Sequence, residues 1–348
     1  MKKTLFLSFV ALLVTACTSE SKYKESATFI WDDIKQSQQL KGEEVKFDDP
    51  VMKPIRVGVQ DSLLFTIDAA EDTIFSVYNL HRGSFVGKRI QRGQGPNDML
   101  QPSFVQINKK EISLFDMTTS SISFYGLTDF VSTDGTSCSH KTQLSDQVFG
   151  DVCYLDDQIL TAAYGKDQPF YLFDHQGGGK KEWGAFPVLT GDYTNLVNSE
   201  AFQSTFTTNG KDRVAVCHSW TDLIELYDKS GRLIKRLHGP EGFLPYFKEV
   251  AADQGKMVRP EQGKQRDAYY NPVSVGDRFF VLFNGGYVDA KDYSTLSTRL
   301  LVFTWEGELS EVFHLDQGVF TYTVDPLSKT IYGISDSPEF HIVKFSYQ

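Results

Sequence analysis

A short apolar segment that ends in an aromatic residue recurs six times along the chain, with longer polar stretches between the copies. The first copy is residues 74–78, Ile-Phe-Ser-Val-Tyr. The segments are rich in Val, Ile, Leu, Tyr and Phe, which favours β-strands over helices. Apolar side chains occupy consecutive positions, as expected for strands that are covered on both faces. The six terminal aromatic residues are Tyr78, Tyr125, Phe173, Tyr227, Phe303 and Phe345.

The intervals between these aromatic residues indicate a repeated supersecondary unit. They measure 47, 48, 54, 76 and 42 residues, and a period of about 40–50 residues is typical of propellers. The interval of 76 residues is too short for a further complete unit, so we interpret it as one unit plus an insertion at residues 239–271. Within this insertion, residues 246–257 predict a short helix with Phe247, Val250 and Ala251 on one face.

Each unit is expected to contain four antiparallel strands. A second apolar run precedes each aromatic segment, and a first strand such as residues 55–59 completes the unit. Glycine favours a tight turn into the next strand because it accepts a positive φ. Such a glycine follows four of the aromatic residues, as Gly83, Gly177, Gly231 and Gly307. The predicted fold is therefore an all-β, six-bladed β-propeller with four antiparallel strands per blade, over residues 41–348.

The sixth unit lacks its outermost strand, because Phe345 lies close to the end of the sequence. An open apolar edge favours aggregation. Residues 44–47, Glu-Val-Lys-Phe, precede the first unit and belong to no blade of their own. We expect this N-terminal strand to close the last blade, where burial of Val45 and Phe47 would contribute roughly 1.5–3 kcal/mol each.

The N-terminus has the features of a bacterial export signal. Residues 1–16 combine a Met-Lys-Lys start with an apolar run of about ten residues, shorter than the roughly 20 residues of a membrane-spanning helix. Residues 14–17, Val-Thr-Ala-Cys, resemble a lipobox, whose cysteine is lipidated; the alternative is an ordinary signal with an incidental cysteine. We expect lipidation at Cys17, a polar tether over residues 17–40, and a cell-envelope location with the lipid in the outer membrane. The side of that membrane stays open.

The charge balance argues against a nucleic-acid partner. The net charge is −10, and removal of residues 1–16 takes away Lys2 and Lys3, giving −12. An acidic surface favours solubility and repels phosphate backbones. Three further cysteines remain, Cys138, Cys153 and Cys217. An exported protein can pair two of them, with Cys138 and Cys153 the candidate pair, but an odd number leaves at least one free. Cys217 lies in an apolar strand and is expected to be buried.

Residues 91–102, QRGQGPNDMLQP, form the sharpest local motif, and residues 238–245 are a degenerate copy. Both should connect one blade to the next, since Gly-Pro marks a tight turn. The motif at Arg92 to Asp98, the lipobox and the closing residues 337–342 (SPEFHI) together resemble the TolB-like six-bladed propeller lipoproteins. The resemblance covers about residues 40–348 and implies an architecture and export, but no reaction. Asp98 stands where that family often has glutamate.

The expected topology brings several polar and aromatic residues to one mouth of the ring. Loops between the second and third strands share a face with the connectors between blades, which suits a polar ligand such as a sugar or peptide. In the alternative interpretation each of these residues satisfies a local turn. The candidate mouth residues are Asp68, Arg92, Asp116, Tyr164, His218, Trp220, Asn284 and Tyr287.

No catalytic motif supports an enzyme. The sequence has no CxxC, HExxH or GxSxG pattern, and its seven histidines are scattered. We therefore favour a non-enzymatic binding or scaffold module for a protein, peptide or glycan, without a predicted cofactor. The alternative is a metal-dependent hydrolase or lactonase, or a lyase, on the same fold, for which a divalent metal at the pore would be required. A third interpretation is a purely structural envelope protein.

Overall fold

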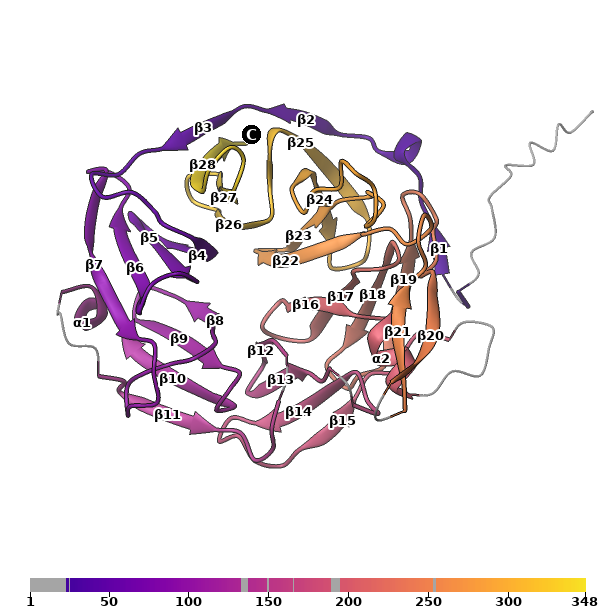
Figure 1. Cartoon of the computed structure of the whole chain (residues 1–348), viewed down its shortest axis with the longest axis horizontal. Helices are drawn as coiled ribbons and strands as arrows, with labels where there is room; N and C mark the ends of the chain where they lie inside the picture. The colour runs from indigo at the N-terminus through magenta and orange to yellow at the C-terminus, as the bar shows by residue number, and fades with distance from the viewer. Residues whose placement is uncertain are drawn as a thin grey trace, which may run out of the picture.

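The computed structural model describes residues 23–24, 26–132, 137–148, 150–164, 166–188, 195–252 and 255–348. These residues form six blades arranged in a ring around a central axis, as Figure 1 shows, together with a separate two-stranded hairpin. The predicted all-β, six-bladed propeller is confirmed. No helix in these ranges is long and apolar enough to cross a membrane.

The first three blades follow one another in the chain, and their strands are ordered from the axis outward. Blade 1 consists of β4 (Pro54–Gln60), β5 (Leu63–Asp68), β6 (Thr73–Asn79) and β7 (Ser84–Gln91). Blade 2 consists of β8 (Pro102–Ile107), β9 (Glu111–Asp116), β10 (Ser121–Gly126) and β11 (His140–Gln143), with helix α1 (Leu127–Ser132) between its last two strands. Blade 3 consists of β12 (Val152–Leu155), β13 (Gln158–Ala162), β14 (Phe170–Asp174) and β15 (Lys181–Trp183).

The other three blades each receive one strand from the N-terminal part of the chain. Blade 4 contains β16 (Ser204–Thr208), β17 (Arg213–His218), β18 (Leu223–Asp228), β19 (Leu233–His238) and, outermost, β1 (Ser26–Thr28). Blade 5 contains β22 (Tyr269–Val275), β23 (Arg278–Phe283), β24 (Ser297–Thr304), β25 (Leu309–Val319) and β2 (Ser37–Leu40). Blade 6 contains β26 (Thr321–Asp325), β27 (Thr330–Ser335), β28 (His341–Ser346) and β3 (Gly42–Val45).

The aromatic residues that defined the repeat all lie in the third strand of their blades and are all buried. Their strands are covered on both faces, as the runs of consecutive apolar residues predicted. Six apolar clusters of the described residues each join two consecutive blades. The glycines predicted at the following turns, Gly83, Gly177, Gly231 and Gly307, all have positive φ. The core is therefore a closed series of interfaces between neighbouring sheets.

The N-terminal strand closes the ring as predicted. β3 pairs antiparallel with β28, with Val45 opposite Ile342. The paired strand is Gly42–Val45 and so begins two residues earlier than the predicted segment 44–47. Phe47 lies beyond the strand and packs on Tyr78 of blade 1, with ring centroids 4.4 Å apart. Residues 44–47 thus seal the interface between the last blade and the first.

The predicted tether over residues 17–40 is too long on its C-terminal side. Residues 26–45, which we call the strap, run along the outer edges of blades 4, 5 and 6. β1 pairs parallel with β19, and β2 pairs parallel with β25. Between them, Trp31 of the short 3-10 helix η1 (Trp31–Asp33) packs on Phe283 of blade 5. Polar composition misled the prediction, because edge pairing uses backbone groups and needs few apolar side chains. The predicted signal, residues 1–16, and Cys17 lie outside the described residues.

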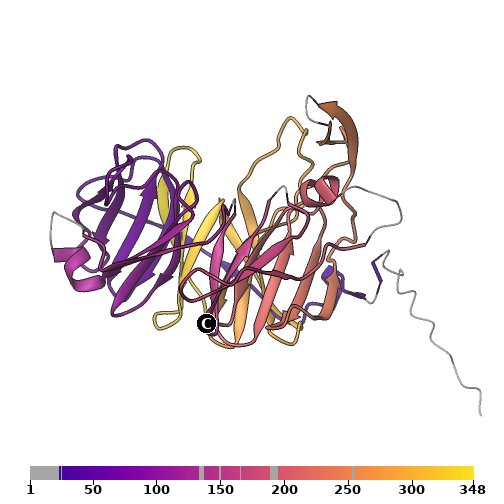
Figure 2. The same ribbon diagram turned by 90° about the horizontal axis from the view of Figure 1, so that it is seen from below.

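The helix predicted over residues 246–257 is wrong. This part of the insertion is a β-hairpin of β20 (Phe247–Ala252) and β21 (Gly255–Pro260), which projects beyond the blades in Figure 2. Phe247 pairs with Pro260, and Glu249 pairs with Val258. Val258 is buried, and its backbone N–H donates to Glu200 of helix α2 (Asn195–Ala201). The hairpin is favoured because it places Phe247 and Val258 on the one face that packs against this helix.

The candidate disulfide is not formed. Cys138, Cys153 and Cys217 are all free thiols. Cys217 is fully buried in β17, as expected. Cys153 lies in the innermost strand of blade 3, whereas Cys138 precedes the outermost strand of blade 2.

Candidate functional site

One face of the ring carries both the connections between blades and the loops between second and third strands; we call it the connector face. In blade 1, β5 ends there at Asp68, and β7 leads there into the connector that begins at Arg92. The hairpin β20–β21 belongs to the connector between blades 4 and 5 and lies on the same side. The topological argument that grouped the candidate residues on one face is therefore correct.

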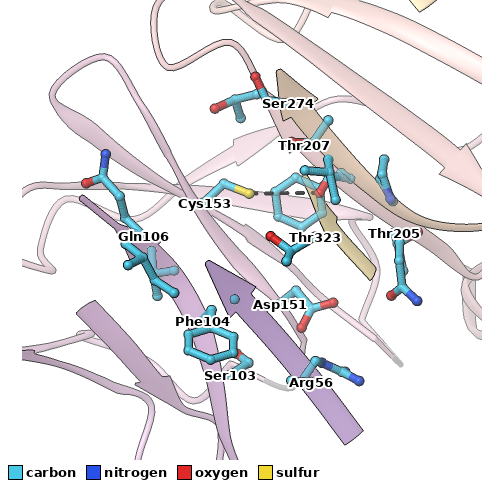
Figure 3. Close-up of a pocket in the computed structure, with 18 of the residues that line it drawn as sticks. Arg56, Ser103, Phe104, Gln106, Asp151, Cys153, Thr205, Thr207, Ser274 and Thr323 are labelled. Atoms are coloured by element: carbon cyan, nitrogen blue, oxygen red, sulfur yellow. Dashed lines mark hydrogen bonds between the residues drawn. The ribbon is translucent and has the colours of Figure 1, made fainter. Parts of the chain in front are cut away.

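A central channel runs through the ring, with a cavity volume of about 530 Å³. The innermost strand of every blade lines it. Each of these strands pairs with only one neighbour in the described sheets, so its second edge is open toward the axis. Many of the lining side chains carry hydroxyl groups, as the labelled residues of Figure 3 show: Ser103, Thr205, Thr207, Ser274 and Thr323. The channel thus offers hydrogen-bond donors and acceptors along its length.

A second, smaller pocket of about 240 Å³ lies at the connector-face end of the channel, between blades 1, 2 and 3. It shares Arg56, Ser103 and Asp151 with the channel lining. Most of its other side chains are apolar: Ile55, Ile67, Ala69, Leu100, Pro102 and Met117. We call it the side pocket.

Two of the predicted mouth residues, Asp68 and Asp116, hold local turns. Asp68 is buried, and its carboxylate accepts hydrogen bonds from the backbone N–H groups of Lys53 and Ala70, at 2.6 and 2.8 Å. Asp116 is also buried and accepts from three backbone N–H groups, at 3.0, 3.2 and 3.0 Å. Their carboxylate oxygens are occupied by the protein itself, as the alternative interpretation proposed.

Arg92 is likewise used internally. Its guanidinium donates to four backbone carbonyls, those of Asp68, Ala69, Glu71 and Leu100. Further along the same motif, the carboxylate of Asp98 accepts from the backbone N–H of Gly95 at 2.9 Å. The connector motif thus fastens the passage between blades 1 and 2 to the loop that follows β5. Arg92 and Asp68 both line the side pocket, but as part of its frame.

His218 lies inside blade 4 and not at the mouth. It is buried, with Nε2 3.1 Å from a carboxylate oxygen of Glu225 and Nδ1 3.3 Å from the carbonyl oxygen of Phe202. Glu225 also accepts from the hydroxyl of Tyr227 at 3.0 Å and from Nε of Arg236 at 2.6 Å. The topological argument placed the end of β17 correctly but could not show that its last side chain turns inward.

The remaining candidates differ in how much of each side chain is available to a ligand. Asn284 is engaged, since its side chain accepts from Gly286 N at 2.8 Å and donates to the Ser294 carbonyl at 2.9 Å. Trp220 is half-buried. Tyr164 and Tyr287 keep 38% and 46% of their surface exposed, so both retain an aromatic surface on the connector face.

The two charged residues of the channel lining were missed by the sequence analysis. They are Arg56, near the start of β4, and Asp151, directly before β12. Within the described ranges neither side chain forms an ion pair. The only hydrogen bond of the Arg56 side chain there joins Nη1 to the adjacent carbonyl of Ile55, at 3.0 Å, and the Asp151 carboxylate has none. A single charge at the start of an inner strand carries no periodic signal, so only the fold shows that the two belong together.

Both charges line the opening where the side pocket joins the channel, and both affect groups nearby. Burial raises the pKa of Tyr164 well above its ordinary value; the negative charge of Asp151 adds to this effect, and Arg56 opposes it. The Tyr164 hydroxyl donates to the Ser204 carbonyl at 2.9 Å. Burial, assisted by Asp151, also raises the pKa of Cys153 to about 12. Arg56, Asp151, Tyr164 and Cys153 therefore form one electrostatic neighbourhood. From here on, the mouth means these four residues, which form a smaller area than the opening predicted from the sequence.

The described part of the chain contains no group of three or more His, Cys, Asp or Glu side chains arranged to hold a metal ion. Three candidate mouth residues that have side-chain oxygens, Asp68, Asp116 and Asn284, already accept hydrogen bonds from backbone N–H groups. The metal-dependent hydrolase or lyase stays an untested prediction.

A family model for TolB-like 6-blade propeller-like proteins matches residues 31–326. The match covers most of the chain and agrees with the ring of six blades. The chain belongs to the TolB-like six-bladed propeller family. The resemblance inferred from the connector motif and the closing segment is therefore confirmed.

Solved structures show how widely the fold of this TolB-like propeller is shared. A DUF4221-family member from Bacteroides vulgatus has a TM-score of 0.56 at 9% identity, over 89% of this chain and 96% of that one. Raptor from Chaetomium thermophilum has a TM-score of 0.50 at 9% identity, over 88% of this chain and 28% of that one. We find no match among curated proteins. At these identities the likeness concerns the fold alone.

Proposed function

We propose that this TolB-like propeller is an exported, lipid-anchored binding module of the cell envelope, which holds a protein, peptide or glycan at its mouth. The observation that carries the proposal is the pair of Arg56 and Asp151. Both line the channel and the side pocket, and in the described residues neither is neutralised by an ion-pair partner.

A charge that is partly removed from water costs free energy unless a partner compensates for it. Several other charged residues of this propeller follow that rule: Arg92, Asp68, Asp116 and Glu225 all have partners within the chain. In the described residues Arg56 and Asp151 lack an ion-pair partner, and they lie together at an opening, beside an apolar pocket and a channel rich in hydroxyl groups. Ligand sites commonly combine a concave apolar surface with a few well-placed polar groups.

The N-terminal sequence supports the envelope location. The lipobox-like residues 14–17 predict an anchor at Cys17, and the folded body begins by Tyr23, which is buried. Six residues can span at most roughly 20 Å when fully extended. A lipid at Cys17 would therefore keep the propeller close to the membrane surface, where a partner in the envelope is at high effective concentration.

The experiment is crosslinking and capture of partners from the native envelope with the full-length lipoprotein. We expect Arg56→Ala combined with Asp151→Ala to lose the captured partner. The matched control is Arg82→Ala combined with Asp157→Ala, which removes the same two charges from exposed positions in turns on the opposite face. Equal capture by the mouth variant and the wild type would contradict the proposal.

A further inference from the structure

We infer that the mouth recognises a dipolar ligand, an α-amino acid or short peptide with a free ammonium group, a free carboxylate and an apolar side chain. This inference rests on the proposed function and names the ligand class. In the inferred complex Asp151 pairs with the ammonium group, Arg56 pairs with the carboxylate, and the apolar side chain occupies the side pocket.

The first argument is charge. Among the described residues, Arg56 and Asp151 are the only charged ones that line the channel, and they do not form an ion pair with each other. A ligand with a single charge would satisfy one of them and leave the other without a partner, at a cost. A neutral glycan would leave both without an opposite charge. A ligand that carries both charges satisfies both groups at once, and the planar guanidinium of arginine suits a carboxylate in particular.

The second argument is the shape of the side pocket. Its volume of about 240 Å³ lies below the roughly 300–1,000 Å³ of sites for larger ligands, so it fits one side chain. Its walls are mainly apolar, and Arg56 and Asp151 stand where it joins the channel. An apolar side chain that enters the pocket from a dipolar backbone would leave that backbone between the two charges.

The third argument concerns ligands longer than one residue. The rest of β4 after Arg56 lines the channel, and so does β12, which begins directly after Asp151. Each strand has one edge unpaired in the described sheets. Open strand edges bind extended peptides through backbone hydrogen bonds. A second or third peptide residue can therefore continue along either strand. Free amino acids and short peptides share the recognition chemistry, and the experiment separates them.

The experiment is isothermal titration calorimetry on the purified full-length lipoprotein in detergent. The probes are leucine, leucyl-leucine, N-acetyl-leucine without the ammonium group, and leucinamide without the carboxylate. We expect leucine or leucyl-leucine to bind and each blocked probe to bind roughly ten- to a hundredfold more weakly, as for lost charged hydrogen bonds. Tighter binding of leucyl-leucine than of leucine would assign the site to peptides, and the reverse would assign it to free amino acids.

Substitutions at the mouth assign each end of the ligand. With Arg56→Gln, the preference for leucine over leucinamide should disappear while the preference over N-acetyl-leucine remains. Asp151→Asn should have the opposite effect. Arg56→Lys keeps the charge and should retain part of the affinity, which separates a charge effect from misfolding; thermal melting checks the fold of each variant. The controls are Arg82→Gln and Asp157→Asn.

Two results would overturn the inference. One is binding of free and blocked probes with equal affinity, or binding that neither substitution changes. The other is no binding of any dipolar probe at millimolar concentration, while the envelope partner is still captured through Arg56 and Asp151. The second result would reject the ligand class and leave the proposed function standing. If capture of the envelope partner does not depend on Arg56 and Asp151, the proposed function itself is rejected.

Discussion

Glu225 shows how this propeller keeps a charge in its interior. The side chain is about 1% exposed and is held by His218, Tyr227 and Arg236. Burial by itself raises the pKa of Glu225, but hydrogen bonds and charge from His218 and Arg236 outweigh it, and the net result is a pKa below the ordinary value. The carboxylate is therefore part of the folded state's stability, and its contribution depends on pH.

Glu225→Gln should destabilise the protein by about 3–5 kcal/mol at neutral pH, because it breaks a buried ion pair from one side. The pKa in the folded state is lowered, so the stability is present above the unfolded pKa of about 4.3 and is lost as the pH falls through the folded value. The wild type should thus lose stability more steeply than the variant below about pH 4. Urea denaturation as a function of pH measures both curves. Glu306→Gln, at an exposed position, is the control. If the stabilities of the wild type and Glu225→Gln change in parallel with pH, the carboxylate of Glu225 does not contribute as described.

Cys153 should react slowly with alkylating reagents although it lines the channel. Its pKa of about 12 leaves little thiolate at pH 8. We expect iodoacetamide to modify it at least about a hundredfold more slowly than in the unfolded chain, whose cysteines have a pKa of about 8.5, because the thiolate fraction at pH 8 falls from roughly a quarter to about 0.01%. Asp151→Asn should speed the reaction, since it removes a negative charge that opposes the thiolate. Peptide mapping by mass spectrometry follows each cysteine separately, with the fully buried Cys217 as an unreactive reference. Rapid modification of Cys153 in the native wild type would contradict its raised pKa.

At the scale of single residues, the sequence shows which positions are buried in strands but not which polar groups find partners. The buried anchors such as Tyr78 and Phe303 were predictable because apolar runs report burial directly. Asp68 and Arg92 were correctly placed on one face, yet their side chains bond to their own loops. Arg56 and Asp151 were not predictable, because being without a partner depends on everything that surrounds a charge in the folded chain.

At the scale of elements, the strap pairs with the outer edges of half of the ring, blades 4, 5 and 6. It adds a fifth strand to blades 4 and 5 and the fourth strand to blade 6. At its last strand the packing is tight. A Cβ atom added to Gly42 would lie 2.7 Å from Val343 Cγ2 and 2.9 Å from Phe345 Cε1. The backbone N–H of Gly42 donates to the Asp316 carboxylate at 2.7 Å, which fixes the glycine in this position.

Gly42→Ala should therefore destabilise the protein by about 1–3 kcal/mol, the usual cost of overpacking. Backbone strain does not explain such an effect, because Gly42 does not have a positive φ. Urea denaturation measures the change in the free energy of unfolding. The control is Glu43→Ala in the same strand, which removes only an exposed ion pair with Lys344. A Gly42→Ala variant as stable as this control would show that β3 does not close blade 6 in the way described.

Elements were predictable where their cause is local or periodic. The second and third strands of every blade follow from apolar runs between turn signals, and the closing strand follows from the unpaired sixth blade. The two strap strands that precede β3, β1 and β2, and the hairpin β20–β21 were missed, because all of them depend on partners that are distant in the sequence. β1 and β2 pair through their backbones, and Val258 finds its contacts on α2.

At the scale of the whole molecule, the predicted lipid anchor determines where the mouth can work. Cys17→Ser should move the protein from the membrane fraction to the soluble fraction, because the variant would lack the predicted acyl chains that anchor it. Fractionation and immunoblotting measure the distribution. Thr18→Ala, directly beside the predicted modification site, is the matched control and should stay with the membrane. Retention of Cys17→Ser in the membrane fraction would argue for another attachment.

The order of the strap's contacts has a mechanical consequence. A pull that arrives from the N-terminus meets the buried Tyr23 and the three paired residues of β1 first, then the four of β2, and only afterwards the strand that locks the last blade. Under load the outer strands would peel from blades 4 and 5 in sequence while the ring stays shut. If the propeller is tethered by its N-terminus, release of β1 and β2 lengthens the segment between the tether and the ring. The ring can therefore withstand tension before its binding face deforms.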